Sequence, residues 1–170
     1  MIADPRSPVC RKPAGGVAAV ELSSAANIRE AAFDGGGSLQ RCTQLDFADD
    51  EAVMRCRLLE DRSSLVERLS VEGGAAIVTH TLRLVADRNT ARAWLEPRFA
   101  EELMCCGCVA AVTLADGRRV VAGVSRKFGT GQPLKLRSLT IDSGCRATDQ
   151  PAVELVLESQ DTAFAAALNE

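Results

Sequence analysis

Residues 65–86 read LVERLSVEGGAAIVTHTLRLVA, and this stretch decides the fold class. Apolar residues alternate with polar or β-branched ones around Gly73-Gly74, which is the pattern of two antiparallel strands joined by a tight turn. The returning strand has an apolar face interrupted only by His80, and its opposite face is β-branched or charged. A long two-stranded ribbon with one face exposed to solvent can protrude from the core as an assembly device or a lid. The residues expected to make its assembly contacts are Leu69, Val71, Gly73, Gly74, Ile77 and Thr79.

A second hairpin is predicted around Asp116-Gly117, the strongest short-range turn signal in the chain. Val112 and Leu114 lead into this turn, and Val120 leads away from it. Because both faces are largely apolar, we expect this hairpin at the centre of the fold with material packed on each side. A two-residue turn gives the cross-strand partners Leu114 with Arg119, Thr113 with Val120, Val112 with Val121 and Ala111 with Ala122.

The period of the apolar residues changes from 2 to 3.6 after residue 89, which predicts a helix. Asn89 or Thr90 is the expected N-cap, and Gly107 the expected stop. Pro97 deletes a backbone hydrogen bond inside this run, so the helix is expected to kink or to restart as two short pieces. One stripe of the helix carries Trp94, Leu95, Phe99 and Leu103.

Hairpin connections dominate the rest of the chain. Eight or nine strands are predicted, which include residues 17–23, 39–47, 52–58, 134–141 and a final strand around 153–157. The expected fold is therefore mainly β (α+β), an antiparallel β-sandwich or barrel with one principal flanking helix and a long protruding hairpin. Residues 1–14 hold three prolines and are expected to form an extended N-terminal arm, residues 15–160 one domain, and residues 161–170 an Ala-rich tail or short helix.

Composition narrows the possible partners. The 170 residues are 46% hydrophobic and 25% charged with a net charge of -3, which is typical of a globular protein. That charge gives no broad positive field, so sequence-specific nucleic acid and acidic lipid are not expected partners. No apolar run reaches the roughly 18 residues of a membrane span, and the N-terminus lacks the apolar stretch of a signal peptide. We expect the chain to begin in the cytoplasm, with reduced and mostly buried cysteines.

Residues able to carry chemistry are few. Cys105, Cys106 and Cys108 contain a Cys-x-x-Cys spacing, which can chelate zinc or form a redox pair. The motif sits at a helix end, where the dipole raises a thiol pKa, so buried small hydrophobic residues are the favoured interpretation. His80 lies among apolar neighbours and is expected to be satisfied inside the sheet rather than catalytic. We therefore expect no catalytic residues, no metal and no cofactor, in a protein that is not an enzyme.

Several segments together resemble prophage-encoded tail structural proteins. They are Cys10 and Gly15-Gly16-Val17 leading to a strand that ends near Ala26-Asn27-Ile28, the ribbon from Leu65 to Val85, Asp87-Arg88-Asn89 opening a helix, and the stretch from Val112 to Gly123. The last of these is similar to the tail-tube type of β-barrel, and the resemblance covers about residues 10 to 160. It implies a tail or injection-tube subunit that forms rings, typically hexameric, through sheet edges and a hairpin, without catalytic residues. Pro97 and the Cys105 to Cys108 cluster depart from that pattern.

Three functions follow as hypotheses. The leading one is a self-assembling phage tail subunit, whose partners are copies of itself and other tail proteins, in the host cytoplasm during assembly and then in the virion. The second is a metal-binding or redox module that uses Cys105, Cys106 and Cys108. The third is a barrel that holds a small apolar ligand, although small residues such as Ala110, Ala111, Ala122 and Gly123 indicate a filled interior.

Overall fold

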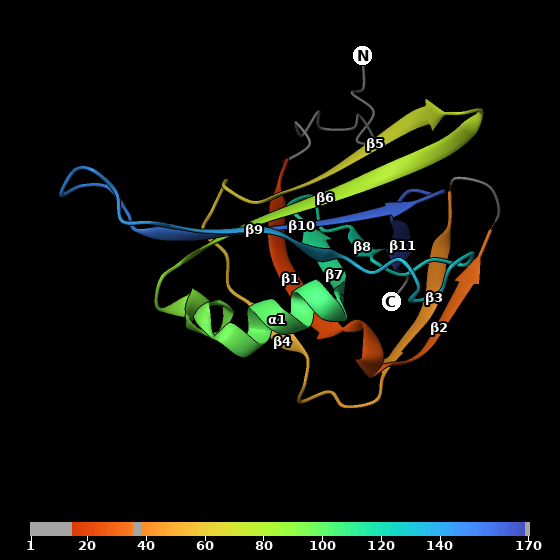
Figure 1. Cartoon of the computed structure of the whole chain (residues 1–170), viewed down its shortest axis with the longest axis horizontal. Helices are drawn as coiled ribbons and strands as arrows, with labels where there is room; N and C mark the ends of the chain where they lie inside the picture. Colours follow the sequence, from red (N-terminus) through yellow and green to blue (C-terminus); the bar gives the residue numbers. More distant parts are fainter. Residues whose placement is uncertain (1–14, 36–38, 169–170) are drawn as a thin grey trace, which may run out of the picture.

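The computed structural model describes residues 15–35 and 39–168 as two β-sheets and one main helix (Figure 1). The strands are β1 (Val17–Ser24), β2 (Ile28–Asp34), β3 (Arg41–Phe47), β4 (Met54–Cys56), β5 (Ser64–Glu72), β6 (Ala75–Asp87), β7 (Cys108–Leu114), β8 (Arg119–Ala122), β9 (Lys135–Asp142), β10 (Ala152–Asp161) and β11 (Ala166–Leu168). The helical elements are the 3-10 turns η1 (Ala25–Asn27) and η2 (Thr90–Leu95) and the α-helix α1 (Pro97–Cys105). The predicted arm, residues 1–14, lies outside the described residues.

The two sheets form a sandwich and not a closed barrel. The larger sheet has the strand order β2-β3-β11-β8-β7-β1-β4, and the smaller sheet has the order β5-β6-β10-β9. Among the described residues neither sheet closes on itself, so of the two predicted architectures the sandwich is confirmed. The smaller sheet is antiparallel throughout, which fits its hairpin connections.

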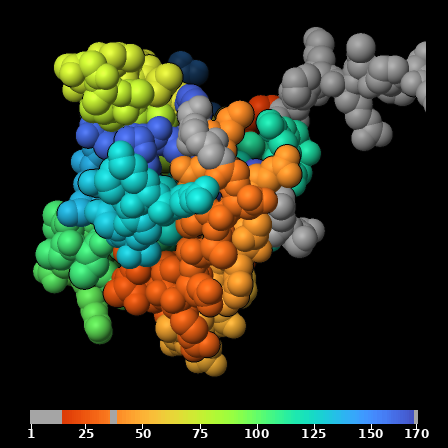
Figure 2. Space-filling model, turned by 90° about the vertical axis from the view of Figure 1, so that its right-hand side faces the viewer, coloured from red at the N-terminus to blue at the C-terminus, as the bar shows by residue number. Residues whose placement is uncertain are grey.

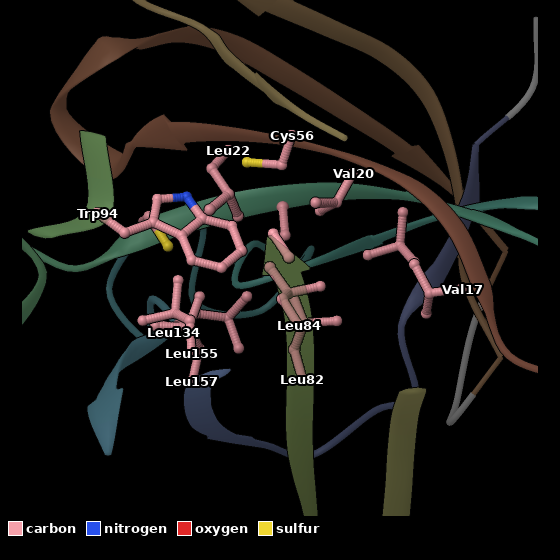
Figure 3. Packing of buried hydrophobic residues seen from close by; sticks show 14 of the residues in the cluster. Val17, Val20, Leu22, Cys56, Leu82, Leu84, Trp94, Leu134, Leu155 and Leu157 are labelled. Atoms are coloured by element: carbon pink, nitrogen blue, oxygen red, sulfur yellow. The ribbon is translucent and has the colours of Figure 1, made fainter. Parts of the chain in front are cut away.

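The main core lies between the two sheets and is closed at one end by η2 and α1. Figure 3 shows the indole of Trp94 between Leu22 and Cys56 on one side and Leu134 and Leu155 on the other. Trp94 is 2% exposed. Burying each Val or Leu side chain of this core contributes about 1.5–3 kcal/mol of transfer free energy, so the core holds the sheets together.

A second, smaller core lies on the opposite face of β7 and β8. Val109 and Val121 are buried there against β3 and β11. The other face of the same two strands, with Val112 and Ala122, belongs to the main core. The predicted central position of this hairpin is therefore confirmed.

The predicted register of the β7–β8 hairpin is wrong by one residue. Ala111 lies opposite Val121, Val112 opposite Val120, and Thr113 opposite Arg119. The turn is a three-residue loop, because the N–H of Leu114 donates to the carbonyl of Arg118 and the N–H of Gly117 donates to that of Leu114. Gly117 has a φ of 90°, as expected of a type I turn followed by a left-handed glycine.

The helical region is divided in two, as the sequence predicts. Pro97 occupies the first turn of α1. Backbone N–H groups in the first turn have no acceptor within the helix, so proline costs no hydrogen bond there. Gly107 follows the helix with a φ of 72°, and its N–H donates to the carbonyl of Glu102. Asn89 holds the predicted N-cap position before η2, but its side chain makes no capping hydrogen bond. Asp87 instead accepts hydrogen bonds from the backbone of Asn89 and Thr90 and from the Thr90 hydroxyl. These bonds hold the pKa of Asp87 below its ordinary value.

Two strands are missing from the sequence-based prediction. β2 follows β1 after a single 3-10 turn and pairs with β3. β11 lies within residues 161–170, where a tail or short helix is predicted, and it joins β3 in parallel and β8 in antiparallel pairing. β10 is therefore not the final strand, and the described residues hold eleven strands rather than eight or nine.

Candidate functional site

The predicted assembly residues all lie in the β5–β6 hairpin. Gly73 and Gly74 form its turn with φ values of 57° and 82°, and a two-residue type I′ turn needs both angles positive. Figure 2 shows this hairpin, in yellow-green, as a lobe at one end of the molecule. The structure therefore brings Leu69, Val71, Ile77 and Thr79 together around one turn.

The two faces of the hairpin differ in how far the rest of the molecule buries them. Leu69 and Val71 are on the face that β6 turns toward the core, yet they are 50% and 71% exposed. Val78, the cross-strand partner of Leu69, is completely buried. Ile77 and Thr79 point to the opposite face and are partly buried. The apolar inner face of the hairpin is thus buried at Val78 but exposed to solvent at Leu69 and Val71, nearer the turn.

Both edges of the smaller sheet are open. Within residues 15–35 and 39–168, β5 pairs only with β6, and β9 pairs only with β10. An edge strand presents backbone N–H and C=O groups that can pair with another chain. β9 also carries an exposed apolar side chain, Ile141, and the sequence patterns gave no sign that this strand forms an edge.

Ion pairs on the outer face of the smaller sheet join neighbouring strands. Arg83 on β6 donates from Nε to Glu154 Oε2 on β10 at 2.7 Å, and Arg137 on β9 pairs with Glu158 on β10. Both pairs are partly exposed, so each contributes at most about 1 kcal/mol. These pairs link β6 to β10 and β9 to β10 on the outer face, and neither pair involves a residue of β5.

His80 is buried on β6, as predicted, and it contacts the segment that leads to β11. Its Nε2 lies 2.9 Å from the carbonyl oxygen of Ala163 and 3.7 Å from Glu67 Oε1. Glu67 also accepts a hydrogen bond from the backbone N–H of Ala165. Nδ1 has no hydrogen-bond partner within the described part of the chain. This arrangement orders the segment between β10 and β11, and it exposes no ring nitrogen for proton transfer to a substrate.

The cysteine cluster is divided between surface and core. Cys105 and Cys106 are exposed at the end of α1, which corrects the expectation that the thiols here are buried. Cys108 is buried on β7, where loss of solvent, with smaller effects of Cys56 and Glu102, raises its pKa to about 12. Among the described residues no group of three or more His, Cys, Asp and Glu side chains could hold a metal ion.

An apolar cavity of about 170 Å³ lies between α1 and strands β1 and β4. Its apolar walls include Leu22, Met54, Phe99 and Leu103, and Glu102 is at its side. A cavity of this size is comparable to one that holds benzene. It lies beside α1 and is lined by neither the hairpin nor β9, so it is separate from the sheet edges.

No family model, curated protein or solved structure matches this chain. No helix in residues 15–35 and 39–168 is long and apolar enough to cross a bilayer. The functional interpretation therefore rests on the residues of the chain, above all on the edge strands β5 and β9, where Leu69, Val71 and Ile141 are exposed.

Proposed function

We propose that this chain is a non-enzymatic structural subunit of a phage tail, of the tube-like kind, which assembles with copies of itself into rings or tubes. The contacts would be made by strand edges, by the N-terminal arm and by the β5–β6 hairpin. Assembly would take place in the host cytoplasm, and the subunit would then remain in the virion beside other tail proteins.

One observation carries the proposal: in the part of the chain that the structure describes, both edges of the smaller sheet are open, and its edge strands run in opposite directions. Each neighbouring pair in the order β5-β6-β10-β9 is antiparallel, so β5 is antiparallel to β9. When copies are related by rotation, β9 of one copy can therefore continue the antiparallel ladder beyond β5 of the next. Such a head-to-tail contact repeats, giving a ring where the rotation closes and a filament where it does not.

The exposed apolar residues of the hairpin support the same proposal. Leu69 and Val71 expose apolar surface at the edge where a neighbour would add its strand. Backbone hydrogen bonds give such a contact its affinity, and side chains give it its register. Together the contacts between two copies must bury more than about 1,000 Å² to be lasting.

The chemistry of the site favours assembly over catalysis. His80 is occupied with the backbone of Ala163, and Cys108 is separated from Cys105 and Cys106 by burial. A redox or metal module using all three thiols would first require Cys108 to leave the core.

Electron microscopy of the purified full chain tests the proposal. Rings or tubes of uniform diameter are the expected result. Isolated single copies at every concentration would contradict it.

A further inference from the structure

The two open edges of the smaller sheet carry matching apolar side chains. On β5 these are Leu69 and Val71, which share the inner face of the sheet with buried Val78. On β9 they are Ile141, which is 51% exposed, and Leu139, which is partly buried against the main core; their partners on β10 are the buried Val153 and Leu155. Both edges therefore present uncovered apolar surface on the same face of the sheet.

The outer face of the same edges carries complementary charges and small polar residues. On β5 these are Arg68 and Ser70, and on β9 they are Thr140 and Asp142. Arg68 is exposed and makes no ion pair with any residue in the described part of the chain. Asp142 is exposed, and its Oδ1 accepts the N–H of Gly144.

We infer that β5 of one copy pairs antiparallel with β9 of a second copy, with Leu69 opposite Ile141 and Arg68 opposite Asp142. This inference rests on the proposed function, and it adds which edges meet and in which register. The same register places Val71 opposite Leu139 on the inner face and Ser70 opposite Thr140 on the outer face.

Neighbouring registers are worse on both faces. A slip of one residue places inner side chains opposite outer ones, because side chains alternate along a strand. A slip of two residues in one direction places Glu67 opposite Ile141, and it places Val71 opposite Arg137, where the pairing of β9 with β10 is irregular. In the other direction it places Leu69 opposite Ser143, beyond the end of β9.

A disulfide cross-link between copies tests the register. The background variant of the full chain carries Ser in place of Cys10, Cys105, Cys106 and Cys145. In this background, Ser70→Cys is combined with Thr140→Cys. Directly opposite residues have Cβ atoms about 4.5–5.5 Å apart, close to the span of a disulfide, and diagonal ones about 7–8 Å. Oxidation is therefore expected to give a ladder of linked multimers on a denaturing gel. The matched control, Ser70→Cys with Ser138→Cys, is expected to give little linkage.

Charge reversal gives a second measurement, which does not depend on thiols. Arg68→Asp and Asp142→Arg are each expected to weaken association by roughly fivefold, and the double variant to restore it. Arg29→Asp, at an exposed position on β2 in the larger sheet, is the control and should leave association unchanged. Circular dichroism and melting curves confirm that each variant folds.

The outcomes separate the register from the proposed function. If the unmodified chain assembles, linkage of Ser70→Cys with Thr140→Cys together with the charge rescue supports the register. Assembly with equal or greater linkage through Ser138→Cys, or with no effect of charge reversal, overturns the register but leaves the proposed function standing. A chain that never assembles overturns both.

Discussion

Leu69 on β5 and Val78 on β6 lie directly opposite each other, yet Val78 is completely buried and Leu69 is half exposed. Val78 lies on an inner strand, because β10 pairs with β6 as far as Val78, whereas Leu69 lies on β5, which has no second neighbour among the described residues. Two neighbouring apolar residues thus differ in exposure: Val78 stabilises the fold, and Leu69 exposes the surface to which the proposed function assigns a partner.

Substitution by aspartate should separate these two roles. Val78→Asp places an unpaired charge in the core and is expected to reduce the free energy of unfolding by about 3–5 kcal/mol. Leu69→Asp should cost less than about 1 kcal/mol, because the charge remains in water, and should weaken association between copies. Urea unfolding and sedimentation velocity measure the two effects. A Leu69→Asp chain that associates as strongly as the unmodified one would exclude this residue from the contact.

Two glycines with the same backbone angle should respond differently to alanine. Gly123 and Gly117 both have a φ of 90°, which costs a residue with a side chain about 1–2 kcal/mol. A Cβ at Gly123 would lie 2.6 Å from the carbonyl oxygen of Cys108, whereas a Cβ at Gly117 meets nothing within 4 Å. Gly123→Ala should therefore be more destabilising than Gly117→Ala by about 1–3 kcal/mol in urea unfolding. Equal losses would mean that the strands near Gly123 can separate freely.

Ser63 supports the strand β6 by a single buried hydrogen bond. Its hydroxyl oxygen accepts the backbone N–H of Val85 at 2.9 Å. Ser63→Ala leaves that N–H without a partner and should lower the free energy of unfolding by about 1–3 kcal/mol. Ser143→Ala, in an exposed loop, is the control and should change it by less than about 0.5 kcal/mol. An equally small loss at Ser63 would show that water reaches Val85.

The thiols should fall into two classes of reactivity. At pH 8 a thiol reagent should modify the exposed Cys105, Cys106 and Cys145 in the folded chain, and should reach Cys56 and Cys108 only after unfolding. Rapid native-state modification of Cys108 would contradict its position in the core.

Two of the three buried thiols in the described part of the chain, Cys56 and Cys108, also predict how stability depends on pH. Burial raises the pKa of Cys56 to about 11 and that of Cys108 to about 12, above the ordinary value of 9.0. The folded chain therefore keeps protons that the unfolded chain releases above pH 9. Their contribution to stability is complete below pH 9 and is lost as the pH rises toward 11 and 12. Urea unfolding at pH 8 and pH 10 should show this decline, and Cys108→Ala should reduce it.

Local patterns predict local structure well in this chain. Gly73-Gly74 between two alternating runs gives the β5–β6 hairpin, and Pro97 marks the start of α1. These predictions succeed because turn and helix-start chemistry depends on a few adjacent residues. The β7–β8 register fails for a related reason: Asp116-Gly117 suits both a two-residue turn and the observed three-residue loop, and the sequence does not distinguish them.

Contacts between distant segments are what the sequence leaves open. β2 is interrupted by two irregularities in its pairing with β3, which hide the alternation of its side chains. β11 is a short Ala-rich strand whose pairing with β3 and β8 brings distant parts of the chain together. In the β5–β6 part of the candidate site, the sequence predicts both the turn and the apolar residues. The β9 half, with Ile141 and Asp142, becomes apparent only once the strand order shows that β9 is an edge.

Hydrogen exchange of the full chain at low and high concentration tests the central claim most directly, that the open edges of the smaller sheet join copies together. Backbone amides of β5 and β9 should both become protected as concentration rises, while those of β2 and β4, at the edges of the other sheet, should not change. Assembly that protects neither β5 nor β9, or a chain whose exchange is the same at every concentration, would contradict the account.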